Sequence, residues 1–106
     1  MQILIVNFNL DGLSEEEFES RCDEIAPAFA AVRGLASKVW LADRVEGTFG
    51  GVYTFESEKA VDDFLHSDLF TGVGSTPGLV NISVRRFGVL DGPTRVTRGS
   101  TQAAGV

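Results

Sequence analysis

The chain has few of the residues on which metal binding and covalent catalysis depend. Its 106 residues include one cysteine, Cys22, and one histidine, His66. A single cysteine cannot form an internal disulfide, so the fold does not depend on an oxidising compartment and we expect a cytoplasmic location. One histidine and one cysteine are also too few for a typical zinc or iron site, so we expect no metal.

Basic residues and long apolar runs are scarce as well. Nine Lys and Arg stand against 15 Asp and Glu, which gives a formal charge of −6. Neutralising phosphates requires clustered basic residues, so we expect no nucleic-acid partner. Residues 2–6 are apolar but have no basic leader, and no run approaches the roughly 20 apolar residues of a membrane helix. We therefore expect neither a secretory signal nor a membrane segment.

The chain does contain segments whose apolar residues recur with the spacing of strands and of helices. Ser14 and Glu17 have the spacing of a capping box, and apolar residues at intervals of three and four follow them as far as Gly34. Pro27 lies inside this stretch, where we expect a kink rather than a break. The pattern predicts, in order, a strand over 2–9, a helix over 15–33, a hairpin over 38–57, a helix over 58–66, a loop over 71–78 and a strand over 79–90.

The order βαββαβ is typical of an α+β ferredoxin-like fold, a four-stranded antiparallel sheet with two helices on one face. Residues 1–90 form this domain, and 91–106 read as a C-terminal tail, polar and flexible. The first and last strands carry apolar residues toward both faces. We therefore expect a homodimer through the open sheet face.

Several polar and aromatic residues interrupt the apolar strands and form the candidate site. Buried polar groups need partners, so their convergence indicates either an internal network or a pocket for a polar ligand. Trp40 taken alone is more typical of a core residue. Either Arg85 or Arg86 can face the pocket, and a one-residue bulge would exchange them. The candidates are Asn7, Trp40, Tyr53, Asn81, Ser83 and Arg85.

Other catalytic patterns have weaker support. His66 is the one candidate for a histidine base, but a lone histidine near a helix end is more often an exposed polar residue. The glycines of "GTFGG" and "GVGSTPG" do not have the spacing of a phosphate-binding loop. A nucleotide site is therefore not expected.

Two adjacent glycines, Gly50 and Gly51, lie in the middle of the second hairpin strand. Consecutive strand residues point to opposite faces, so one gap would face the helices and the other the dimer partner. Trp40 should lie opposite one of them and cover it. Close packing or a bulge would explain the pair, and so would room for a flat ligand beside Trp40 and Tyr53.

The segment "FAAVRGLASKVWLADRVEGTFGGVYTFESEKAVDDFL" and the preceding Pro27 resemble the YdhR-type mono-oxygenase family. This family lies within the dimeric α/β-barrel superfamily, which includes the antibiotic-biosynthesis mono-oxygenases. The resemblance rests on Pro27, Gly34, "KVW" and "GGVYTFESEKA" and covers roughly residues 1–90. It implies a homodimeric barrel with a pocket for a small aromatic molecule in each subunit.

The resemblance also implies a function. Some superfamily members oxidise polyketide-like phenols with O₂ and without a cofactor, and we expect the same chemistry on an aromatic or quinone-like metabolite. By this resemblance Asn7, Tyr53 and Arg85 would be catalytic, with His66 as a possible base. Substrate would contact Trp40, Gly50, Phe64, Asn81 and Ser83.

Two other readings of the same pocket stay open. One is a non-catalytic carrier dimer, and the other is a lyase or isomerase, which the scarcity of bases disfavours. A haem-degrading branch of the superfamily has a histidine near the position of Gly74 and a tryptophan near that of Phe64. Because this chain has neither residue at these positions, we do not expect haem degradation.

Overall fold

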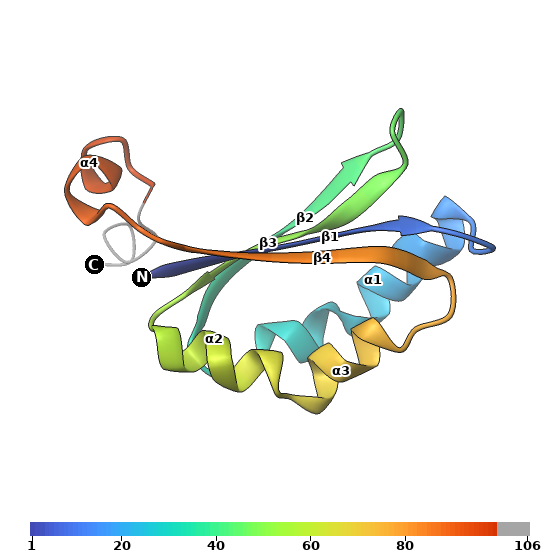
Figure 1. Cartoon of the computed structure of the whole chain (residues 1–106), viewed down its shortest axis with the longest axis horizontal. Helices are drawn as coiled ribbons and strands as arrows, with labels where there is room; N and C mark the ends of the chain where they lie inside the picture. Colours follow the sequence, from blue (N-terminus) through green and yellow to red (C-terminus); the bar gives the residue numbers. More distant parts are fainter. Residues whose placement is uncertain (100–106) are drawn as a thin grey trace.

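A four-stranded antiparallel sheet forms the centre of the protein, whose residues 1–99 are described by a computed structural model. In chain order, the elements are β1 Gln2–Leu10, α1 Glu15–Ala30, β2 Leu35–Asp43, β3 Thr48–Phe55, α2 Glu58–Leu65, α3 Asp68–Gly74, β4 Leu79–Gly88 and α4 Asp91–Val96. The strand order is β2-β3-β1-β4. Helices α1, α2 and α3 lie on one side of the sheet (Figure 1). This arrangement confirms the predicted ferredoxin-like α+β fold.

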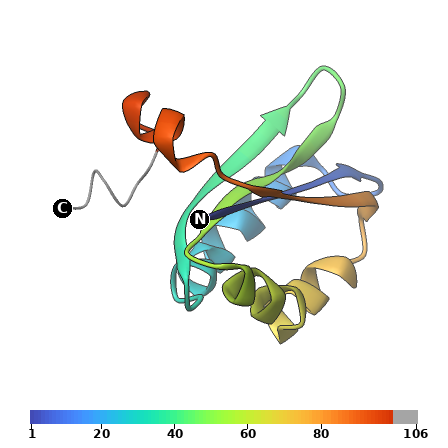
Figure 2. The same cartoon turned by 60° about the vertical axis from the view of Figure 1, so that its left-hand side comes forward.

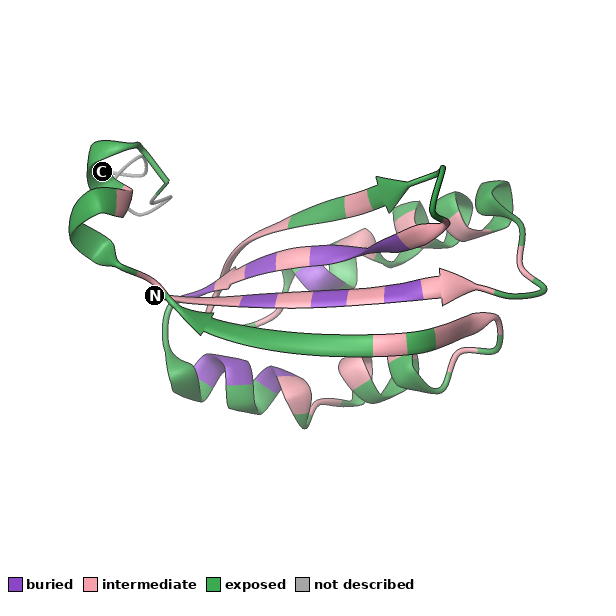
Figure 3. Ribbon diagram, turned by 45° about the horizontal axis from the view of Figure 1, so that its top comes forward, coloured by how far each residue is buried: buried purple, intermediate pink, exposed green. Residues whose placement is uncertain are grey.

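The core lies between the sheet and these helices. Leu4, Val6 and Phe8 of β1 are buried and alternate with half-buried residues, so one face of the strand points into the core. Figure 3 shows this alternation of burial along the strand. Directly paired residues of antiparallel strands share a face. Tyr53 pairs with Leu4 and Phe49 with Phe8, so both also point toward the helices. Among residues 1–99, no helix covers the opposite face of the sheet.

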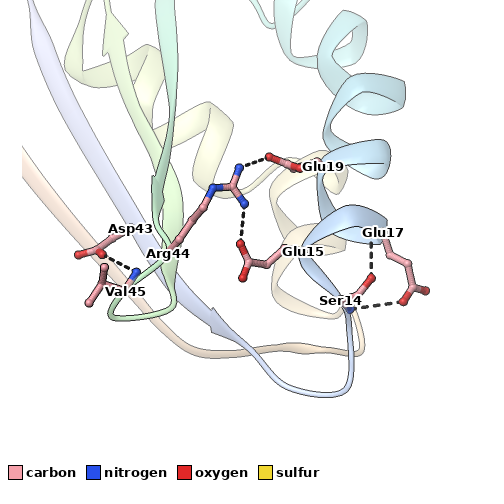
Figure 4. Close-up of polar contacts among 7 residues, drawn as sticks. All are labelled: Ser14, Glu15, Glu17, Glu19, Asp43, Arg44 and Val45. Atoms are coloured by element: carbon pink, nitrogen blue, oxygen red, sulfur yellow. Dashed lines mark hydrogen bonds and ion pairs between the residues drawn. The ribbon is translucent and has the colours of Figure 1, made fainter.

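Helix α1 begins as its sequence predicts. Ser14 Oγ accepts a hydrogen bond from the Glu17 backbone N–H at 3.1 Å, and the Ser14 N–H donates to Glu17 Oε1 at 3.4 Å (Figure 4). The helix runs through Pro27 without a break. Near the same end, Arg44 from the β2–β3 turn forms ion pairs with Glu15 and Glu19. These contacts tie the hairpin tip to the start of α1.

Two helices occur where the sequence indicated a loop and a tail. Residues 71–74, predicted as loop, belong to α3, because the Ser67 hydroxyl caps this helix and Leu69, Phe70 and Val73 pack on the core. Packing outweighs the low helix propensity of its two glycines. Helix α4 lies within the predicted tail and stands away from the sheet in Figure 2. The rest of that tail, residues 100–106, falls outside the described residues.

A bulge interrupts the regular alternation of β4. The β1–β4 register shifts between Asn7 and Asn9, and Asn81 has a φ of 56°. An extra residue at this point turns Ile82 toward the core, so Arg86 points toward the helices and donates to Asp62 of α2 at 2.7 Å. Arg85 consequently lies on the open face.

Within residues 1–99, no helix has both the length and the apolar character to cross a bilayer.

Candidate functional site

A cavity of about 560 Å³ lies between α1, α3 and the covered face of the sheet. The apolar stripe of α1 borders this cavity instead of closing against the sheet, which leaves Ile25 37% exposed. Aromatic rings make up much of the wall. They are Phe8, Phe18, Phe29, Trp40 and Tyr53. The polar lining residues are Arg21, Cys22, Glu24, Lys38, Asp68 and Thr76.

Lys38 lies among three of these rings. Its Nζ is 3.4 Å from the ring centroid of Phe29, 3.4 Å from that of Trp40 and 4.6 Å from that of Tyr53. Phe29 and Trp40 meet edge to face, with centroids 5.4 Å apart. Ring faces attract a cation, so this cluster holds the lysine head group in one place at the cavity wall.

Burial changes the acid–base properties of the cavity. It lowers the pKa of Lys38 to about 7, because removing an ammonium from water disfavours its charged form. Burial also raises the pKa of the Tyr53 hydroxyl. The pKa of the Cys22 thiol is raised, chiefly by burial, with the positive charge of Lys38 acting in the opposite direction. Tyr53 and Cys22 are therefore neutral donors near pH 7, whereas Lys38 can exchange a proton.

The two glycines of β3 differ in what surrounds them. Trp40 was expected opposite one of the two glycines, and it pairs with Gly51. A Cβ at Gly51 would lie 2.8 Å from Lys38 Cε and 3.3 Å from Tyr53 Cε1, so these side chains occupy its gap. A Cβ at Gly50 would instead lie 1.9 Å from the Val6 carbonyl oxygen. Gly50 therefore permits close contact with β1 and does not supply a gap toward a partner.

Three of the predicted site residues meet at this cavity. Trp40, Gly50 and Tyr53 line it. Phe64 is buried with its ring centroid 5.1 Å from that of Tyr53, so it supports the wall from behind. These four residues form one connected group.

The remaining predicted residues lie elsewhere. Asn7 pairs with Ser83 on the open face of the sheet, and Arg85 lies on the same face beside Phe87. Asn81 donates a hydrogen bond to Asn9 at 3.0 Å. His66 is exposed at the end of α2, outside the cavity. The expectation that all these polar residues converge is wrong within one chain. The period of the strands places Asn7, Ser83 and Arg85 on the face opposite the cavity.

The sequence interpretation missed Lys38, although a signal for it exists. Lys38 and Trp40 are two residues apart in β2 and therefore share a face. Placing Trp40 at the pocket also places Lys38 there. What the alternation does not show is that rings from α1 and β3 enclose its head group.

Comparisons with known proteins identify the fold independently. The chain is similar to a haem degrader, MhuD from Mycobacterium tuberculosis, with 18% identity, a TM-score of 0.68, and coverage of 85% of this chain and 96% of that one. It is similar to SnoaB, a cofactor-independent oxygenase from Streptomyces nogalater, with 19% identity, a TM-score of 0.67, and coverage of 85% and 94%.

A third similar structure is described as a putative antibiotic biosynthesis monooxygenase from Deinococcus radiodurans, with 13% identity, a TM-score of 0.63, and coverage of 84% and 92%. At these identities, the likeness shows a shared fold. Among curated protein sequences, none matches this chain. A family model, described as "Putative mono-oxygenase ydhR", matches residues 3–100, so this chain belongs to that mono-oxygenase family.

Proposed function

We propose that this chain is a cofactor-independent mono-oxygenase that oxidises a small aromatic or quinone-like metabolite of polyketide type with O₂. The observation that carries the proposal is the cavity wall, where aromatic faces surround one polar cluster of Lys38, Tyr53 and Cys22. Flat apolar walls with a few placed polar groups suit an aromatic ligand with an oxygen substituent. Membership of a mono-oxygenase family supports the reaction class.

The reaction that fits such a site replaces a ring methylene by a carbonyl. The substrate first loses a proton, its electron-rich carbon combines with O₂, and the resulting peroxide loses water. One oxygen atom remains on the carbon and the other leaves as water, so no further reductant is required. Trp40 would hold the ring by stacking, and the neutral Tyr53 hydroxyl would donate a hydrogen bond to the substrate oxygen.

Haem chemistry is not carried over from MhuD to this chain. Its one histidine, His66, lies exposed at the end of α2, away from the cavity. Residues 1–99 also contain no group of three or more His, Cys, Asp or Glu side chains that could hold a metal ion. The residues that line the cavity therefore include no histidine to ligate a haem iron.

We also propose that the protein acts as a homodimer through the open sheet face. Val39 is 59% exposed and Phe87 39% exposed on this face, and they adjoin half-buried Ile3, Ile5 and Val52. A group of neighbouring apolar side chains on an exposed face favours contact with another protein surface. A cytoplasmic location, which the single cysteine favours, stays a prediction.

The function can be tested by oxygen uptake with a panel of anthrone-type phenols. We expect one O₂ consumed for each ketone formed, and Trp40→Ala should lower kcat/KM by at least about tenfold through lost ring contact. Val45→Ala is the matched control, because Val45 is 93% exposed in the β2–β3 turn. Binding without O₂ uptake by the wild type would favour the carrier reading. Uptake no faster than in buffer for the whole panel would contradict the proposed reaction.

A further inference from the structure

Lys38 differs from the cations of this chain that form ion pairs. Arg44, Lys59 and Arg86 each contact a carboxylate at the surface. Lys38 takes part in none of the ion pairs found among residues 1–99, and its Nζ is surrounded by ring faces. An ammonium partly removed from water without an anion is destabilised, so the site favours either a neutral amine or an incoming anion.

The position of Lys38 is fixed by its neighbours on the sheet. It pairs with Tyr53 across β3, and its methylene chain occupies the gap that Gly51 leaves. Nζ and the neutral Tyr53 hydroxyl are thereby both placed at the cavity. An oxygen atom near this point can meet one group that accepts or returns a proton and another that donates a hydrogen bond.

Other titratable and charged groups of the cavity come from every element around it. Helix α1 presents Arg21, Cys22 and Glu24, strand β3 presents Tyr53, and helix α3 presents Asp68. Of these, Cys22 is the group whose charge couples to that of Lys38, and burial raises its pKa. Lys38 is therefore the cavity residue that burial brings into the range for proton exchange near pH 7.

We infer that the cavity binds weakly acidic phenols and enols as their anions, with Lys38 Nζ first accepting the hydroxyl proton and then serving as the counter-ion. In this step, the O–H bond breaks and an N–H bond forms, so a neutral amine and a neutral phenol become an ammonium–phenolate pair. The inference rests on the proposed function, because such an anion is the form that reacts with O₂. The sequence interpretation named Arg85 as a catalytic residue, but Arg85 lies on the open face, so the role of counter-ion goes to Lys38.

The test uses 4-nitrophenol, whose phenolate has a visible absorption band that the neutral phenol lacks. Titrated into wild-type protein over a pH series, the bound phenol should ionise about one pH unit below the free phenol, which is a tenfold change in its ionisation equilibrium. Lys38→Met should abolish this shift and weaken binding at neutral pH by about tenfold or more. Circular dichroism and urea unfolding would establish that the variant is folded.

Two further variants separate charge from position. Lys38→Arg keeps a positive charge that does not titrate, so it should bind the phenolate but not take up its proton. Lys59→Met removes an exposed lysine that pairs with Asp63 on α2, and it should behave as the wild type does. Binding of the neutral phenol, an unchanged shift in Lys38→Met, or no binding of the phenol at all would each overturn the inference.

The experiments distinguish failure of the anion-binding inference from failure of the proposed mono-oxygenase function. If the bound phenol ionises at a lower pH, Lys38→Met abolishes that shift and no phenol gives O₂ uptake, the results support the anion site and contradict the mono-oxygenase. O₂ uptake that Lys38→Met leaves unchanged, with no shift of the bound phenol, supports the mono-oxygenase and contradicts the role of Lys38.

Discussion

At the residue scale, adjacent glycines of β3 have different physical reasons to be glycine. Gly50 has a φ of 153° and lies against the β1 backbone, so any side chain there would meet a carbonyl that cannot move aside. The gap at Gly51 is filled by the end of a flexible lysine and the edge of a tyrosine ring. One glycine is therefore required by the sheet and the other by the cavity.

Gly50→Ala and Gly51→Ala should consequently differ in what they damage. We expect Gly50→Ala to lower the free energy of unfolding by more than about 3 kcal/mol, because a backbone clash and an unfavourable φ combine. Gly51→Ala should cost about 1 kcal/mol and weaken 4-nitrophenol binding, because Lys38 must shift. Urea unfolding and the phenol titration measure the two effects. Equal loss of stability in both variants would contradict this distinction.

Lys38 should also make stability depend on pH. Its pKa is about 7 in the folded protein and 10.5 ordinarily, so between these values the unfolded chain holds a proton that the folded chain has lost. Stability contributed by this residue therefore rises as the pH increases above about 7. The raised pKa values of Cys22 and Tyr53 act in the opposite direction, from about pH 9 upward.

The measurement is the urea midpoint of wild type and Lys38→Met at about pH 6 and about pH 8. Other titrating groups are common to both proteins, so the difference between them isolates Lys38. The wild type should gain more stability over this interval than the variant does. Parallel changes in the two proteins would show that Lys38 keeps an ordinary pKa.

At the scale of elements, local signals determine where α1 begins. Ser14 makes both hydrogen bonds of its capping box at an exposed position, so the helix start depends little on tertiary packing. The acidic first turn, Glu15 to Glu17, adds a favourable interaction with the helix dipole.

Ser14→Ala should therefore lower the free energy of unfolding by about 1 kcal/mol, the usual cost of losing an N-cap. Ser20→Ala, at an exposed position within the same helix, is the matched control and should have no destabilising effect, since alanine is the better helix former. Urea unfolding of the two variants checks this. An equal loss in Ser20→Ala would remove the cap as the explanation.

The sequence predicted those features of the fold that depend on local interactions. The capping box follows from spacing alone, and the hairpin spacing places Trp40 opposite one of the two glycines, which the structure shows to be Gly51. Helix α3 could not be predicted in this way, because its glycine-rich turn is stabilised by Leu69, Phe70 and Val73 on a distant core. The bulge was an open alternative, and its position depends on Asn81 adopting a positive φ.

The candidate site was predictable only in part, for a similar reason. Trp40, Gly50 and Tyr53 lie on one hairpin, so strand pairing brings them together. Lys38 was missed because charged residues are usually exposed, and its burial depends on Phe29 from α1 as well as on its own hairpin. Asn7 and Arg85 were placed by chemical type, which does not determine the face of a strand.

At the scale of the whole molecule, the uncovered sheet face determines what assembly we expect. One face of the sheet is buried under three helices (Figure 1), and the other carries exposed Val39 and Phe87. A face-to-face pair of sheets would remove these side chains from water, with a gain of about 25 cal/mol for each Å² of apolar surface.

Val39→Glu should therefore shift the protein from dimer toward monomer, because it would bury a carboxylate between the paired sheets. Sedimentation velocity measures the change. Val45→Glu introduces the same charge at a turn where the side chain is already 93% exposed, and it should leave the dimer intact. A wild-type monomer at all concentrations, or equal dissociation in both variants, would contradict the proposed assembly.

The bulge of β4 has a consequence for the behaviour of the protein at high concentration. β4 is an edge strand of the sheet, and unpaired edges can recruit further strands from other molecules into aggregates. The positive φ of Asn81 breaks the regular row of backbone donors and acceptors, and Arg85 adds a charge along the same edge. Open-ended growth by strand addition is thus disfavoured on this side, and self-association is directed to a surface where two copies complete each other and no third can follow.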